Sequence, residues 1–222
     1  GVAFFSGQPV AAVDAEADSH SAAASNPTLD GDVAKLESSL GGVPASQPTL
    51  SLVLVTGLPG SGKSYFSRQL CSRYPLAYLN SDALRKVLFP RPAHDAAEHE
   101  RLFAAVHALL ERLLARGLSA VLDATSLKEE HRQPLYEIAE EAGARLVIVQ
   151  TEAPPDVARE RLEARARGDD RQDASEATVA VYDRMRRDME PIERPHIKVD
   201  TSKQIEPALT DVVQQLAIAN RV

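Results

Sequence analysis

One eight-residue stretch constrains the fold more than any other part of the chain: Gly57–Ser64, which reads GLPGSGKS. It matches in full the G-x-x-x-x-G-K-[ST] pattern, whose glycines let backbone N–H groups converge on phosphate oxygens. It follows Ser51–Thr56, an apolar run typical of a buried strand, and it precedes helical sequence that continues to about Tyr74. The N-terminus of that helix adds partial positive charge at the same point. The motif therefore predicts a strand–loop–helix unit that binds nucleotide phosphates.

The positions of this phosphate loop have separate expected tasks. Lys63 is expected to reach the β- and γ-phosphates, and the Ser64 hydroxyl is expected to bind Mg²⁺. The sequence lacks the NKxD-type guanine signature, so ATP is the predicted nucleotide. The residues predicted to contact it are Gly57, Gly60, Ser61, Gly62, Lys63, Ser64 and Tyr65.

Short apolar runs alternate with helical patterns along the rest of the chain. Strand-like runs occupy residues 51–56, 77–80, 118–124, 144–150 and 196–199. Strands that alternate with helices pair in parallel through right-handed crossovers. The sequence therefore predicts the α/β fold of P-loop NTPases, a three-layer α/β/α sandwich around a five-stranded parallel sheet. Ligands of such sheets bind beyond the carboxyl ends of the strands.

Two helix starts are predicted from capping residues. Ser126 and Glu129 match a capping box at the start of one helix. Asp173 and Glu176 are expected to open a later helix that runs to about Met189.

The first fifty residues differ in composition from the rest. Ala, Ser, Gly and Pro supply 26 of them, and six acids with one base give this segment a net charge of −5 out of −7 for the chain. We predict that residues 1–49 are a flexible linker or tail, with a short helix around Asp32–Leu40, and that residues 50–222 form the P-loop domain. The near-neutral remainder lacks the basic surplus expected of a nucleic-acid-binding domain.

Other residue counts exclude several classes of protein. Cys71 is the only cysteine, which rules out an internal disulfide and a cysteine zinc site. No apolar stretch approaches the roughly 20 residues that a membrane span needs. The six histidines show no metal-ligand spacing and are interpreted as surface or groove residues. A cytoplasmic location is expected.

Four motifs in order resemble those of the polynucleotide-kinase-like P-loop kinases. They are the phosphate loop, N-S-D-A-L-R at Asn80–Arg85, V-L-D-A-T at Val121–Thr125, and an R-x-x-x-R lid formed by Arg161 and Arg165. This group also contains zeta toxins and many small bacterial ATP-binding kinases. The resemblance spans about residues 50–201. It implies transfer of the γ-phosphate of ATP to a hydroxyl group of a polynucleotide 5′ end, a nucleotide sugar or another small metabolite.

The resemblance also implies roles for the acceptor-side residues. Asp82 matches the general base that accepts the hydroxyl proton, although an aspartate after a strand can instead cap a helix. Arg85 matches the arginine that holds an acceptor phosphate; its alternative is a surface charge. Asp123 is expected to bind Mg²⁺ through water or to contact the acceptor, and Thr125 is a weaker neighbour.

The lid arginines have two interpretations. Arg161 and Arg165 match the residues that neutralise charge on the transferring phosphoryl group. Alternatively, they belong to a solvated helix face paired with Glu160 and Glu163.

A second function class remains open, a P-loop ATPase whose hydrolysis drives a conformational switch. The Asp-Ala-Thr sequence that ends the third strand lacks the adjacent glutamate that positions a water, which argues against the ATPase.

The acceptor itself also remains open. The acidic balance and the few aromatic residues favour a small molecule, whereas Asp82 with Arg85 favours a polynucleotide 5′ end.

Overall fold

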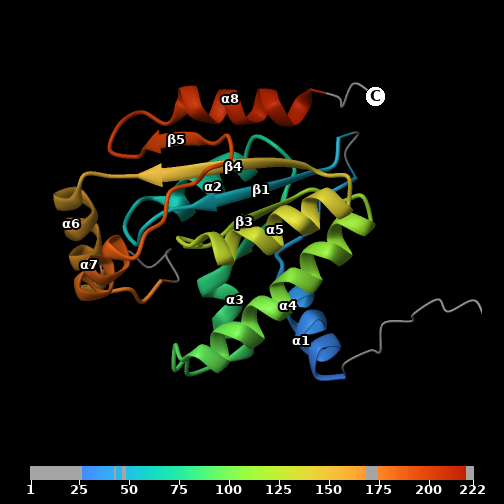
Figure 1. Ribbon diagram of the computed structural model, residues 1–222, viewed down its shortest axis with the longest axis horizontal. Coiled ribbons are helices and arrows are strands. Elements are labelled where there is room, and N and C mark those ends of the chain that lie inside the picture. The colour runs from blue at the N-terminus through green and yellow to red at the C-terminus, as the bar shows by residue number, and fades with distance from the viewer. Residues whose placement is uncertain (1–26, 43, 47–48, 169–174, 219–222) are drawn as a thin grey trace, which may run out of the picture.

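A computed structural model of the chain describes residues 27–42, 44–46, 49–168 and 175–218 (Figure 1). At its centre is a parallel sheet of five strands in the order β2-β3-β1-β4-β5. Asp123 in β3 pairs with Val55 in β1 and with Asn80 in β2, so the carboxyl ends of these three strands lie level. The strands are β1 (Ser51–Thr56), β2 (Ala77–Asn80), β3 (Ala120–Asp123), β4 (Arg145–Glu152) and β5 (Ile197–Asp200).

The helices of the described chain lie on both faces of the sheet and beyond one end of it. Figure 1 shows α8 on one side and α1, α4 and α5 on the other, with α6 and α7 past the arrowhead of β4. They are α1 (Pro27–Ser39), α2 (Lys63–Cys71), α3 (Ser81–Leu88), α4 (Ala96–Ala115), α5 (Glu129–Glu141), α6 (Pro155–Ala166), α7 (Val179–Arg187) and α8 (Glu206–Ala217).

Two apolar cores separate these layers. Side chains alternate across a strand, so Leu52 and Leu54 of β1 enter the core beneath α1, α4 and α5. Val53 and Val55 enter the opposite core, beneath α2 and α8. Every residue of β1 is buried, as expected of a central strand covered on both faces. The predicted three-layer sandwich with a five-stranded parallel sheet is confirmed.

The predicted capping box at Ser126 is wrong. The backbone N–H of Glu129 donates a hydrogen bond to Glu190 Oε2 at 2.7 Å, and Ser126 Oγ has no hydrogen-bond partner among the described residues. An acid 61 residues away therefore occupies the position that a local cap would take.

The start of α7 also differs from its prediction. Thr178 caps this helix by accepting a hydrogen bond from the backbone N–H of Val181. Glu176 instead forms an ion pair with Lys86 at 2.8 Å, and Asp173 lies outside the described residues.

Helix α1 belongs to the packed domain, although residues 1–49 were predicted to be a linker or tail. Val33 and Leu36 are buried in the same core as α4. Arg101 of α4 also donates two hydrogen bonds to the Asp32 carboxylate, at 2.7 and 2.9 Å. The predicted short helix is therefore present and extends the domain before residue 50. Residues 1–26 lie outside the described part of the chain.

None of the helices in the described ranges is both long and apolar enough to cross a membrane.

Candidate functional site

Gly60 and Gly62 of the phosphate loop have backbone conformations that only glycine can supply. Gly60 has a φ of 76°, and a Cβ there would lie 2.6 Å from the Ala158 carbonyl oxygen. Gly62 has a φ of 86°, and its Cβ would lie 2.7 Å from Thr201 Oγ1. Both positions combine a left-handed backbone with close packing against another element, so a side chain would distort the loop. Gly62 is also the N-cap of α2 and has no side chain, so no cap at this position competes with a ligand for the first N–H groups of the helix.

The loop side chains differ in what they offer to phosphates. Lys63 Nζ lies 3.1 Å from the Leu58 carbonyl oxygen, across the loop. Ser61 is buried, and its hydroxyl lies 2.7 Å from Thr151 Oγ1. Tyr65 is half exposed on α2. The Ser61 hydroxyl is therefore already engaged within the protein, while the predicted nucleotide contacts of Ser61 and Tyr65 stay predictions.

Ser64, Asn80 and Asp123 form one hydrogen-bonded group at the ends of β2 and β3. Asn80 Nδ2 lies 2.7 Å from Asp123 Oδ2 and 3.3 Å from Ser64 Oγ. The Tyr78 hydroxyl donates to the same carboxylate oxygen at 2.9 Å. Burial raises the pKa of Asp123, and the Lys63 ammonium together with these hydrogen bonds opposes that rise.

This group is the place in the site that suits a hard cation. Mg²⁺ binds through one or two protein oxygens together with water and substrate phosphates. The Ser64 hydroxyl and the buried Asp123 carboxylate, both linked to Asn80, provide that donor set. Asn80 was not predicted to take part. Its place at the end of a strand, next to the pairing partner Asp123, is the signal that could have identified it.

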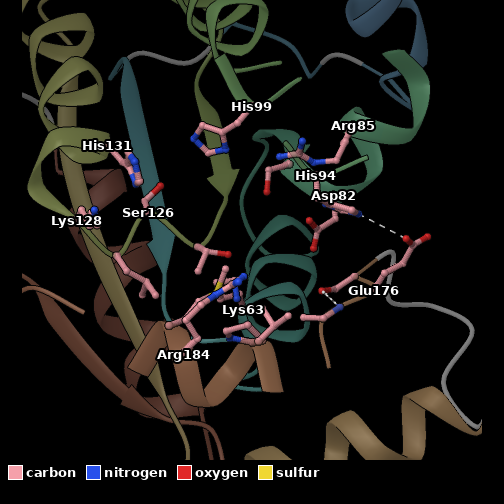
Figure 2. Close-up of a pocket in the computed structure, with 18 of the residues that line it drawn as sticks. Lys63, Asp82, Arg85, His94, His99, Ser126, Lys128, His131, Glu176 and Arg184 are labelled. Atoms are coloured by element: carbon pink, nitrogen blue, oxygen red, sulfur yellow. Dashed lines mark hydrogen bonds and ion pairs between the residues drawn. The ribbon is translucent and has the colours of Figure 1, made fainter. Parts of the chain in front are cut away.

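Asp82 does not cap its helix, which removes the alternative reading of this residue. The N-cap of α3 is Asn80, whose Oδ1 accepts a hydrogen bond from the Ala83 N–H at 2.8 Å. Asp82 lies in the first turn of α3 and lines a pocket with Lys63 (Figure 2).

Arg85 is not a surface charge, and its guanidinium already forms an ion pair within the protein. It is only 8% exposed, and its Nη1 lies 2.5 Å from Glu98 Oε1. Glu98 also accepts a hydrogen bond from the Ala93 N–H at 2.7 Å. Arg85 lines the pocket, but its charge is balanced by a buried carboxylate at the start of α4.

Arg161 is bound to the back of the phosphate loop. Its guanidinium donates to the Gly60 carbonyl oxygen at 3.1 Å, to Thr201 Oγ1 at 2.8 Å and to the Thr201 carbonyl oxygen at 3.0 Å. Arg161 therefore joins α6, the phosphate loop and the turn after β5. In the described chain, neither Arg161 nor Arg165 lines the pocket that holds Asp82.

Arg184 of α7 is an arginine that does reach the pocket. It lines the same cavity as Lys63 and Asp82, and Figure 2 shows it near Lys63. The sequence contains Arg184, Arg186 and Arg187 at the end of a predicted helix, but the pattern does not indicate which of them faces the site.

The pocket has a volume of about 470 Å³ and lies between the phosphate loop, α3, α4, the start of α5, and α7. Thr125 lines it, as do His94, His99 and His131, so three of the six histidines are groove residues. His94 and Ser126 are the non-glycine residues with positive φ in the described chain, at 56° and 39°. Both line this pocket, and backbone strain of this kind gathers at functional sites.

Comparison with known proteins gives this architecture a family. Residues 52–192, well over half of the chain, match AAA_33, described as an AAA domain. The chain belongs to the AAA_33 family. The matched AAA_33 segment contains the phosphate loop, Asp82, Asp123 and both lid arginines.

Among the curated relatives of the chain, a UPF0200 protein of Saccharolobus solfataricus is 31% identical over 139 residues, which are 58% of this chain and 71% of that protein. A putative kinase from Chloroflexus aurantiacus has a similar structure, with a TM-score of 0.59 and 23% identity over 76% of this chain and 99% of that one. Kti12 of Chaetomium thermophilum, solved with ADP-AlF3, also has a TM-score of 0.59, with 23% identity over 75% and 100% of the two chains. These structures share the P-loop kinase fold.

Proposed function

We propose that this AAA_33 protein is an ATP-dependent kinase that transfers the γ-phosphate of ATP to a hydroxyl group of a small molecule. The observation that carries the proposal is the shared pocket of Lys63 and Asp82. One cavity, of a size suited to a small ligand, contains the Lys63 ammonium, which is proposed to bind phosphate, and the Asp82 carboxylate, which does not cap its helix.

The reaction assigns one task to each side chain. Backbone N–H groups of the phosphate loop and Lys63 bind the β- and γ-phosphates. Ser64 and Asp123 would hold Mg²⁺, which neutralises phosphate charge when bound. The acceptor oxygen forms a bond to the γ-phosphorus as the β–γ bridging bond breaks. ADP leaves with that electron pair, and Asp82 accepts the hydroxyl proton.

Charge on the transferring group needs a cation on the acceptor side. We assign that role to Arg184, because it lines the pocket, whereas Arg161 is held by Gly60 and Thr201. Arg161 would act indirectly, by fixing the loop that binds ATP. Arg165 remains a candidate on α6.

Motif order supports placing the chain with the polynucleotide-kinase-like and zeta-toxin-like kinases, and an ATP-consuming enzyme of this kind would act in the cytoplasm. The alternative ATPase reading requires a residue that activates water. The strand end Asp123-Ala124-Thr125 has no adjacent glutamate for that purpose. The ATPase reading also gives Asp82 and its pocket no role.

The test is transfer of labelled γ-phosphate from ATP·Mg²⁺ to pooled small metabolites or to a 5′-hydroxyl oligonucleotide. We expect label in the metabolite pool and its loss in Asp82→Ala. ATP consumption that no acceptor accelerates would contradict the kinase proposal and support the ATPase. Label on the oligonucleotide would keep the kinase but change its acceptor.

A further inference from the structure

Hydrogen-bond donors gather on one side of the pocket, away from Glu176. Figure 2 shows Ser126, Lys128 and His131 there, with His99 of α4 facing the same cavity. The rings of His99 and His131 have centroids 5.4 Å apart. These groups come from two helices and from the segment between β3 and α5, so they meet only in the folded chain.

Ser126 is the member of this group that the protein leaves unsatisfied. The residue is 6% exposed, and its Oγ makes no hydrogen bond to any described residue. A buried hydroxyl without a partner is costly, and so is the left-handed backbone of Ser126, whose φ is 39°. A ligand in the pocket that accepts the hydroxyl's hydrogen bond would remove the first cost. The second is of the kind that gathers at functional sites.

Side chains that can donate hydrogen bonds line this side of the pocket. Burial lowers the pKa of His99, and the neighbouring His131 and Arg85 lower it further. Lys128 adds an ammonium group to the lining, and its Nζ lies 3.3 Å from Glu130 Oε1. Phosphate and carboxylate groups offer acceptor oxygens to such donors, so an anion suits this side of the pocket. Arg85, the residue expected to hold an acceptor phosphate, is already paired with Glu98, so anion binding falls to the other side chains.

We infer that Ser126, His99 and His131 form a subsite for an anionic group of the acceptor, which is therefore a small alcohol that carries a phosphate or a carboxylate. The inference rests on the proposed kinase function for the identity of the bound molecule. The subsite and Asp82 line one pocket of about 470 Å³, so a ligand held by its anion can present a hydroxyl to Asp82. The subsite thus selects the acceptor, while the phosphate loop binds ATP.

Two measurements test the subsite and the transfer reaction separately. The first is calorimetric titration of inorganic phosphate into protein saturated with Mg²⁺ and the ATP analogue AMPPNP, which blocks the phosphate loop. The second is label transfer to matched alcohols: glycerol, glycerol 3-phosphate and glycerate, then glucose, glucose 6-phosphate and gluconate. The phosphate and carboxylate members distinguish the two sources of the anion.

Four variants report on the subsite. Ser126→Ala and Ser126→Gly both remove the hydroxyl, and glycine also suits the observed φ, so a backbone effect would separate them. His131→Gln removes the ring, and His196→Gln is the control because that histidine lies on a different cavity. We expect at least a tenfold weaker phosphate affinity in the first three variants and less than a twofold change in the control.

If the three variants weaken phosphate binding but no acceptor is labelled, the subsite is retained and the kinase proposal is overturned. Neutral alcohols labelled as well as anionic ones, or phosphate affinity that the variants leave unchanged, would overturn the subsite. The subsite would also be overturned if only an oligonucleotide were labelled and Ser126→Gly did not alter the KM for that oligonucleotide.

Discussion

At the scale of single residues, the proposed mechanism separates proton acceptance from nucleotide binding. Asp82→Asn keeps the size of the side chain but cannot accept a proton. We expect label transfer to fall by about 100-fold or more, with ATP affinity changed less than twofold. Lys63→Ala should reduce both, because the contacts proposed between Lys63 and the phosphates exist in the ground state as well as during transfer. Nucleotide titration and single-turnover transfer measure the two effects, and equal losses of ATP affinity would contradict this division.

Arg184 provides the second test at this scale. Arg184→Ala should lower kcat by at least about tenfold while leaving ATP affinity near its original value, because the cation acts on charge that develops during transfer. Arg187→Ala on the same helix is the matched control, since Arg187 is exposed and does not line the pocket. If the two variants behaved alike, Arg184 would have no place in the mechanism.

Side-chain roles were less predictable than side-chain positions. The sequence placed Lys63 and Asp82 after the correct strands and Asp123 at the end of its strand, because those positions follow from local patterns. It could not show that Glu98 neutralises Arg85 or that Thr201 holds Arg161, since each pairing joins residues that meet only after folding. The same reason hid the position of Arg184 on the pocket.

At the scale of elements, strands and most helices could be predicted because their apolar periodicity is local. The extent of helix α1 and its place in the core were not predicted, because its burial depends on α4.

The attachment of α1 to α4 predicts a pH effect on stability. The Arg101 guanidinium holds the pKa of the Asp32 carboxyl below its ordinary value. The ion pair therefore stabilises the fold above pH 4, and this contribution is lost as the pH falls through the lower, folded-state pKa.

Asp32→Asn measures that contribution. Arg101 is half exposed, so the variant should lose only about 1 kcal/mol of unfolding free energy at pH 7. The difference from wild type should shrink toward zero near pH 2. Urea unfolding at both pH values measures it, with Asp30→Asn, an exposed acid on the same helix, as the control. If the difference in unfolding free energy between the variant and wild type did not change with pH, the lost stability would come from packing rather than from charge.

At the scale of the whole molecule, Glu176 connects two sides of the pocket that the chain builds from distant segments. It lies on the segment that leads into α7, and it pairs with Lys86 of α3 at 2.8 Å and with His94 at 3.6 Å. The pocket lies between these segments, so the pairs link its walls. All three side chains are about half exposed, which limits each pair to roughly 1 kcal/mol or less.

We therefore expect Glu176→Gln to raise the KM for the acceptor by about three- to fivefold at low salt, with the KM for ATP unchanged. Exposed charges are screened within about 10 Å at 0.1 M salt and within about 3 Å at 1 M, so the difference from wild type should disappear as salt is added. Glu140→Gln breaks an exposed pair with Arg194 on a surface outside the pocket and should leave both KM values unchanged. A salt-independent increase would mean that Glu176 touches the acceptor directly. Parallel changes in the two variants would mean that the pairs contribute to general stability and do not hold the pocket walls together.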